Sequence, residues 1–195
     1  MIWWLKARKV HSVLLPALAC FIVLALILQD TVAVLPSVTP GGSAHARLIL
    51  FVPIPLVAAI SMSLDARVLA PEISSMRLVG LMDVGLVLIA ALLSISVGAA
   101  VSILFDAPEV AAIGRNTSFL VGLMLCARAM VGAPAVMAPT AWVLAVLFIG
   151  FRSPYNPYYW TVLPESVAAI HASIIAVLVF IAGIIASLCT SRSHP

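Results

Sequence analysis

Apolar residues fill most of the chain, and short polar or proline-rich stretches divide them into six long runs. These runs cover about residues 12–28, 47–64, 78–104, 110–131, 140–151 and 166–188. A helix of about 20 apolar residues crosses the roughly 30 Å hydrocarbon core of a bilayer, and most of the runs approach that length. The pattern therefore predicts an all-α fold, a polytopic transmembrane helical bundle of about six spans that occupies residues 1–195 as a single domain.

Prolines and polar residues mark the expected ends and breaks of these helices. The stretch 30–46 carries two prolines, two adjacent glycines and several polar residues, which predicts a loop. Pro53 and Pro55 lie in the second run, where the missing backbone donors predict a kinked or broken helix. The fifth run is short for a complete crossing, so its helix is either a short span or begins earlier, within the proline-containing segment 132–139.

Composition places the chain in a membrane rather than in water. Hydrophobic residues make up 64% of the sequence and charged residues 9%, which is too little charge to cover the surface of a soluble domain. The net charge of +3 is small, and we assign it to membrane orientation and lipid headgroups, not to nucleic-acid binding.

Cations gather on one side of the predicted membrane. Residues 1–11 hold three cations and two tryptophans, which predicts an interfacial helix, while the segment 65–77 holds two arginines and the tail holds Arg192. On the opposite side, four acidic residues balance the arginines. The positive-inside rule therefore predicts six spans with the N-terminus and the C-terminus both in the cytoplasm.

Three ionisable residues, Asp83, Arg115 and Arg128, fall within the predicted spans, where charge is costly and usually faces the bundle interior. Asp83 and Arg128 are each about five residues from the cytoplasmic end of their span, so they lie at a similar depth and a pair between them is possible. Such a pair would be either a gate or transmission contact, or an ion pair that only joins two helices.

Arg115 lies near the outer surface, where it can reach the interface or meet Asp106 or Glu109. Its neighbour Asn116 is expected to need a hydrogen-bonding partner. We treat both, with Asp83 and Arg128, as candidate intramembrane polar residues.

The segment 152–165 is predicted to be an external loop rich in aromatic residues and prolines. Its candidate functional residues are Tyr155, Tyr158, Tyr159 and Trp160. Aromatic residues of this kind form interfacial belts. The alternative is an outer lid or re-entrant element over a translocation path.

Enzyme signatures are missing from the sequence. No phosphate-binding GxxxxGK[ST] loop, no HExxH and no GxSxG occurs, and the four histidines are scattered. We therefore expect no catalytic residues, no metal site and no cofactor in this chain, and a small intramembrane enzyme is the least favoured reading.

The order of features resembles the membrane subunits of ABC-2 type (type V) ABC transporters. The sequences LDARVLAPEISSMRLVGLMDVGL and GRNTSFLVGLMLCARAMVG are also similar to small six-span permease-like proteins of high-GC Gram-positive bacteria. The resemblance implies that residues 3–9 form the elbow helix and that the segment 65–77 is the coupling helix. The ATPase-coupling residues would then be Asp65, Arg67, Glu72 and Arg77.

The same resemblance implies a multi-pass subunit in a bacterial plasma membrane that exports its substrate. An ATP-binding cassette partner would supply ATP and Mg²⁺, and a second permease copy or a homologous permease would complete the pore. The alternative is a non-transporting membrane protein, such as an immunity factor or a structural subunit of a membrane complex, which equally explains the small size. A neighbouring ATPase gene would favour the transporter.

Overall fold

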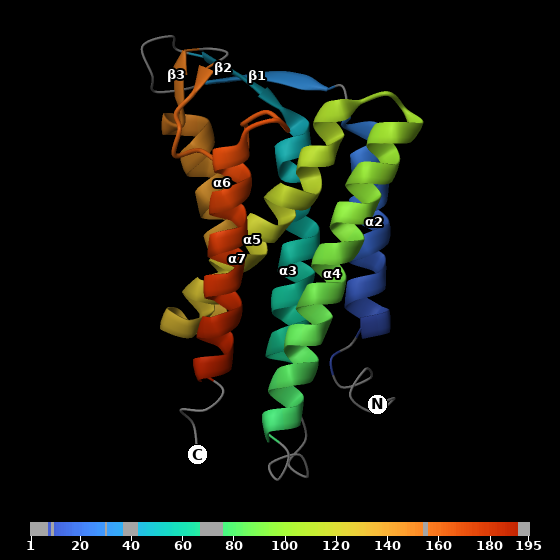
Figure 1. Ribbon diagram of the computed structural model, residues 1–195, viewed down its shortest axis with the longest axis vertical. Coiled ribbons are helices and arrows are strands. Elements are labelled where there is room, and N and C mark those ends of the chain that lie inside the picture. Colours follow the sequence, from blue (N-terminus) through green and yellow to red (C-terminus); the bar gives the residue numbers. More distant parts are fainter. Residues whose placement is uncertain are drawn as a thin grey trace.

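The computed structural model describes residues 8, 10–29, 31–36, 43–66, 76–153 and 156–190. These described residues form a bundle of six α-helices that run alternately up and down (Figure 1). The α-helices are α2 (Leu15–Ile27), α3 (Pro53–Asp65), α4 (Met76–Leu104), α5 (Ala112–Val131), α6 (Ala138–Ile149) and α7 (Ile170–Thr190). The predicted all-α helical bundle is confirmed.

Five of these helices, with the short turns that extend them, are long and apolar enough to cross a membrane. The sixth, formed by the 3₁₀ turn η5 (Ala133–Met137) and α6, is an apolar helix of shorter length. The segment 132–139 therefore forms the beginning of this helix. This agrees with the interpretation that the fifth helix starts within the proline-containing segment.

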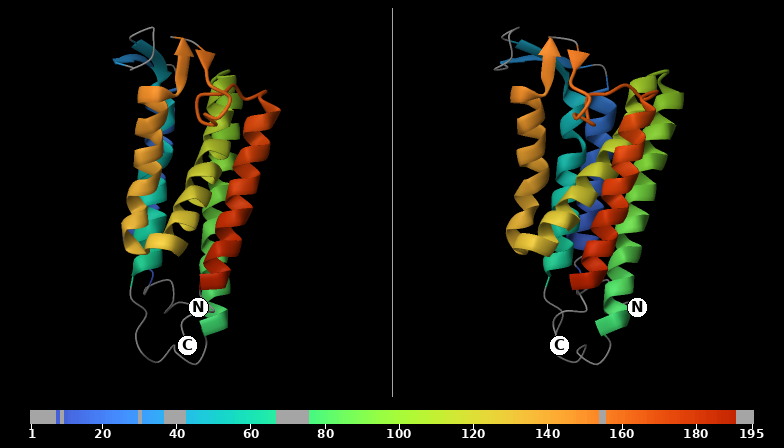
Figure 2. Two further views of the ribbon diagram at one scale, coloured as in Figure 1. Left: turned by 90° about the vertical axis from the view of Figure 1, so that its left-hand side faces the viewer. Right: turned by 60° about the vertical axis from the view of Figure 1, so that its left-hand side comes forward.

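The helices alternate so that their connections gather at two ends of the bundle (Figures 1 and 2). At the end that we call the hairpin end lie the short strands at 32–36, 43–47, 151–153 and 156–157 and the turn between α4 and α5. At the other end, which we call the Asp65 end, α2 begins, α3 ends, α4 begins, α5 meets α6, and α7 ends.

The loop predicted at 30–46 contains a β-hairpin. Strand β1 (Val32–Pro36) pairs with β2 (Ser43–Arg47) in antiparallel register, with Val34 opposite His45. A second small antiparallel pair, β3 (Phe151–Ser153) and β4 (Asn156–Pro157), follows α6.

The two prolines of the second run do not kink a helix, because the α-helix starts at the first of them. A 3₁₀ turn, η2 (Leu48–Phe51), precedes Pro53, and Pro53 occupies the first position of α3. A proline is tolerated there because the first N–H groups of a helix have no partner within the helix.

Helix α5 is the centre of the bundle. Two thirds of its span (67%) is buried, against 17% for α7. It packs closest against α7, where Gly122 and Gly183 face each other: a Cβ added to Gly183 would lie 2.6 Å from the carbonyl oxygen of Gly122. Large apolar side chains of α4 and α7 point outward, as expected of helices that contact lipid or another membrane helix.

Candidate functional sites at the two ends of the bundle

The first candidate site surrounds the end of α3. The last carbonyl groups of a helix have no partner within it and carry partial negative charge, so cations are stabilising there. The guanidinium of Arg8 donates to the carbonyl oxygens of Leu64 (2.8 Å) and Ala66 (3.0 Å), and the hydroxyl of Ser63 donates to the Arg8 carbonyl (2.7 Å). Arg8 is thereby buried against α3, with 6% of its surface exposed.

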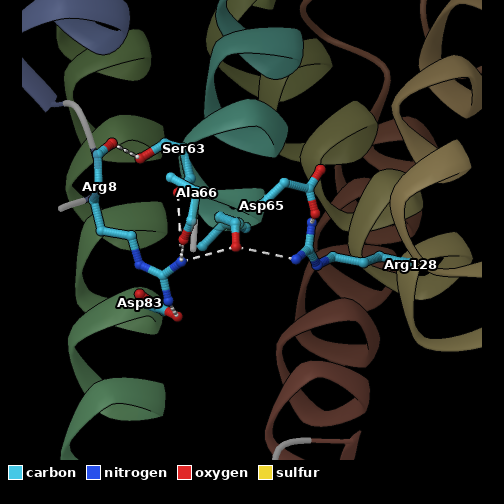
Figure 3. A network of polar contacts seen from close by, with 7 residues as sticks. Arg8, Ser63, Asp65, Ala66, Asp83 and Arg128 are labelled. Carbon is cyan, nitrogen blue, oxygen red and sulfur yellow. Dashed lines mark hydrogen bonds and ion pairs between the residues drawn. The ribbon is translucent and has the colours of Figure 1, made fainter. Parts of the chain in front are cut away.

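Two ion pairs complete this arrangement, which we call the two-arginine network (Figure 3). Arg8 contacts Asp83 of α4 at 2.5 Å, and Arg128 of α5 pairs with Asp65. Arg128 also donates to the carbonyl oxygen of Leu64 at 3.1 Å, so this one oxygen accepts hydrogen bonds from both arginines.

The sequence left open whether Asp83 and Arg128 pair, and the ion pairs that the structure shows join each of them to another residue. Both side chains belong to the same network, but Arg8 pairs with Asp83 and Asp65 pairs with Arg128. Sequence reasoning placed Arg8 in an interfacial segment and so missed it. A signal was available in the sequence: Asp83 lies inside a span, and the cations of residues 6–9 are expected at the same end of the bundle. An acidic residue at that depth needs a cation, and one of these could supply it.

Of the four proposed ATPase-coupling residues, the structure describes the side chain of Asp65. Asp65 is the last residue of α3 and pairs with Arg128. Arg67 and Glu72 lie outside the described residues, and Arg77 lies in the first turn of α4, where its side chain is not described. Most of residues 1–9, the predicted elbow helix, also lie outside the described part. After them, the π-helical turn η1 (Val10–Leu14) continues directly into α2.

The second candidate site lies at the hairpin end, where α5 holds the loop before α7. Arg115 donates to the carbonyl oxygens of Val162 (3.1 Å), Glu165 (2.7 Å) and Ser166 (2.8 Å). Asn116 donates to the Leu163 carbonyl (3.0 Å) and accepts from Arg115 (3.3 Å), which confirms its expected need for partners.

The alternatives offered for Arg115 were incomplete. It forms no ion pair with Asp106 or Glu109 in the described chain, and Glu109 attracts it only at longer range. A side chain binding backbone carbonyls of a loop nearly 50 positions away has no signature in local sequence.

Among the described aromatic candidates of this loop, Trp160 packs onto the rings of the bundle. The ring of Trp160 lies edge-on to Trp142 of α6 at 5.9 Å between centroids, and Trp142 contacts Phe119 of α5. Tyr159 is 82% exposed and meets His171 edge-on, while Tyr158 is exposed at 39%. Tyr155 lies outside the described residues.

A cavity of about 330 Å³ lies next to this loop. Its wall comes from β2 and η2, from the turn before α5 and the first turns of α5, from β3 and β4, and from the loop held by Arg115. Apolar residues such as Leu50, Phe151 and Leu163 form part of it. Its polar lining consists of His45, Arg47, Glu109, Asn116, Glu165 and Ser166.

The fold and these two polar ends define a polytopic α-helical membrane protein. Comparison with protein-family models, with characterised proteins and with solved structures finds no match to the chain. In the described part of the chain, no three His, Cys, Asp or Glu side chains gather in a way that could hold a metal ion.

Proposed function

We propose that this chain is the membrane-spanning permease subunit of an ATP-driven exporter, which couples to a separate ATP-binding cassette subunit through the segment 65–77. The observation that carries the proposal is the two-arginine network, because it lies where that segment leaves α3. The partner would hold ATP and Mg²⁺, and two permease copies, or this one and a homologue, would form the pore in a bacterial plasma membrane.

The network is suited to transmitting force. Hydrogen bonds with a charged partner are stronger than neutral ones, and a helix end without such bonds frays. Here the end of α3 is bonded to α4 through Arg8 and Asp83, and to α5 through Arg128. A displacement applied just after Asp65 would therefore move three helices together, as in rigid-body switching, instead of unwinding one terminus.

The first test is purification from native membranes in mild detergent, with mass spectrometry of what accompanies the protein. We expect a stoichiometric ATP-binding subunit. In the purified complex, Asp65→Asn and Arg128→Gln should lower ATP hydrolysis to the rate of the ATPase subunit alone while the complex stays intact. Arg152→Gln, which removes an exposed cation at the hairpin end, is the matched control and should leave the rate unchanged.

Substitutions in the docking segment itself address the partner surface. Arg67→Gln, Glu72→Gln and Arg77→Gln should uncouple hydrolysis from transport without unfolding the bundle. Coupling retained in all three variants would contradict the assignment of 65–77. A different membrane partner with no ATPase would favour an immunity factor or a structural subunit instead.

A further inference from the structure

The cavity at the hairpin end has the properties of a built binding site. A volume of about 330 Å³ lies in the range of small-molecule sites, which are concave and mostly apolar with a few placed polar groups. Residues distant in sequence meet there: Arg47 from β2, Glu109 and Asn116 from the start of the fourth span, and Glu165 from the loop before α7. Arg115 fixes that loop through three backbone carbonyls, so the wall that carries Glu165 is held in place.

Charged groups lie at two depths in this cavity. Asn116 and Leu163 are each 2% exposed and mark the inner part. The side chains of Arg47 and Glu109 are 49% and 38% exposed, whereas the Glu165 side chain is 16% exposed. A ligand therefore meets a guanidinium near the surface and a carboxylate further in.

The carboxylate of Glu165 has unused hydrogen-bonding capacity. An ionised carboxylate can accept about four hydrogen bonds, and burying it without them is costly. In the described chain it accepts none: the Nε2 atom of His171 lies 3.7 Å away, beyond hydrogen-bond distance. Arg115 attracts it, but four N–H···O bonds to other oxygens already occupy that guanidinium. A primary ammonium, with three donors, would satisfy this carboxylate.

The guanidinium of Arg47 is available to an anion. Its contact with Glu109 is 3.6 Å long and exposed, and such surface pairs contribute little. Guanidinium groups bind phosphate through two parallel hydrogen bonds. The elements that line the cavity lie at the hairpin end of the bundle (Figure 1), the level at which phospholipid headgroups meet a membrane protein.

We propose that this cavity binds a zwitterionic headgroup that carries a primary ammonium next to a phosphate, as in phosphoethanolamine, with the ammonium at Glu165 and the phosphate at Arg47. This site does not rest on the proposed transport function, because it needs no ATPase partner. In this proposal the aromatic loop forms part of the ligand site, and Arg115 holds the loop in position.

The test is retention of lipid by the purified full-length protein, measured by native mass spectrometry after incubation with equal amounts of phosphatidylethanolamine and phosphatidylcholine. The two lipids share a phosphate, but the quaternary ammonium of phosphatidylcholine donates no hydrogen bond. A charge-assisted hydrogen bond should favour phosphatidylethanolamine about tenfold. Glu165→Gln should abolish that preference, and Arg47→Gln should weaken both lipids alike.

Asp106→Asn is the matched control, since it removes an acid at the same end outside the cavity, where Asn tolerates the positive φ of 51°. It should keep the wild-type preference. Equal retention of the two lipids by the wild type, or an unchanged preference in a folded Glu165→Gln variant, would overturn the proposal. Free phosphoethanolamine distinguishes the source of the headgroup: displacement of lipid supports a soluble ligand, and lack of displacement supports the lipid itself.

Discussion

Three arginines of this chain, Arg8, Arg115 and Arg128, donate hydrogen bonds to backbone carbonyls. Arg8 and Arg128 bind the end of α3, and Arg115 binds the loop before α7. Inside a bilayer no water is available for carbonyl groups freed where a helix ends, so protein groups must satisfy them. This explains why costly cations occur in or beside the spans: each stands where regular backbone hydrogen bonding stops.

Arg8→Gln is expected to destabilise the protein by about 3 kcal/mol, because it removes the Arg8 guanidinium from the partly buried carboxylate of Asp83. The double variant Arg8→Gln with Asp83→Asn should recover at least about 1 kcal/mol of this loss, since the carboxylate that Arg8 paired with is then neutral as well. Thermal or denaturant unfolding in detergent of the four members of the cycle measures this coupling. Strictly additive effects would show that the pair is not energetically coupled.

Arg115→Lys should loosen the loop before α7 even though the charge is kept. An ammonium cannot reproduce the planar fork that reaches the carbonyls of Val162, Glu165 and Ser166 together. Loss of two such bonds, at about 1 kcal/mol each, should raise amide hydrogen exchange in residues 161–169 at least about tenfold. Exchange at the start of α4, which lies at the opposite, Asp65 end of the bundle, serves as the internal reference and should not change.

At the scale of helices, the crossing of α5 and α7 depends on two glycines. A Cβ on Gly122 would lie 2.6 Å from the Cα of Phe180, so Gly122→Ala must push the helices apart. We expect a net loss of about 1–3 kcal/mol, because overpacking exceeds the higher helix propensity of alanine. Gly85→Ala in α4 is the control: no atom lies within 4 Å of an added Cβ, and the variant should be neutral or slightly stabilised. Unfolding in SDS titrations compares them.

The elements themselves were largely predictable from sequence. The runs at 12–28 and 78–104 correspond to the helical spans Val10–Ile27 and Met76–Leu104, because the bilayer thickness fixes how many apolar residues a span needs. The hairpin of β1 and β2 was missed, because its two strands are only five residues long each and mix apolar with polar residues.

The contacts within the sites were much less predictable. Depth along the helices placed Asp83 and Arg128 near the same end, which is correct, yet depth does not specify which helices are neighbours or how they are rotated. The partner of Asp83 is Arg8, which precedes the first span and was not considered as a partner for a residue within the spans. Arg115 was identified as a polar residue near the outer surface, but its partners are carbonyl groups, and every residue has one.

At the scale of the whole molecule, the described helices alternate in direction, and this gathers the polar connections at two ends. The positive-inside rule predicts that the Asp65 end faces the cytoplasm. To test this, single cysteines replace Tyr159 at the hairpin end and Ala133 at the turn between α5 and α6, both of which are exposed. The native Cys20, Cys126 and Cys189 are first replaced by alanine.

In intact cells a membrane-impermeant maleimide should label Tyr159→Cys, and it should label Ala133→Cys only after permeabilisation. Labelling of Ala133→Cys in intact cells would show that the protein has the opposite orientation, with the segment 65–77 outside the cell. A cytoplasmic ATPase could then not dock on that segment.

The carbonyl oxygen of Leu64 gives the end of α3 a form of redundancy. Because both Arg8 and Arg128 donate to it, a mutation that removes either one leaves the oxygen with the other donor. The Leu64 oxygen therefore keeps a donor after a single loss, whereas the Ala66 carbonyl loses its bond when Arg8 is removed, and in either case the paired aspartate loses its arginine. A genetic screen on a damaged Arg8 should accordingly recover suppressors at Asp83, and those on a damaged Arg128 should fall at Asp65.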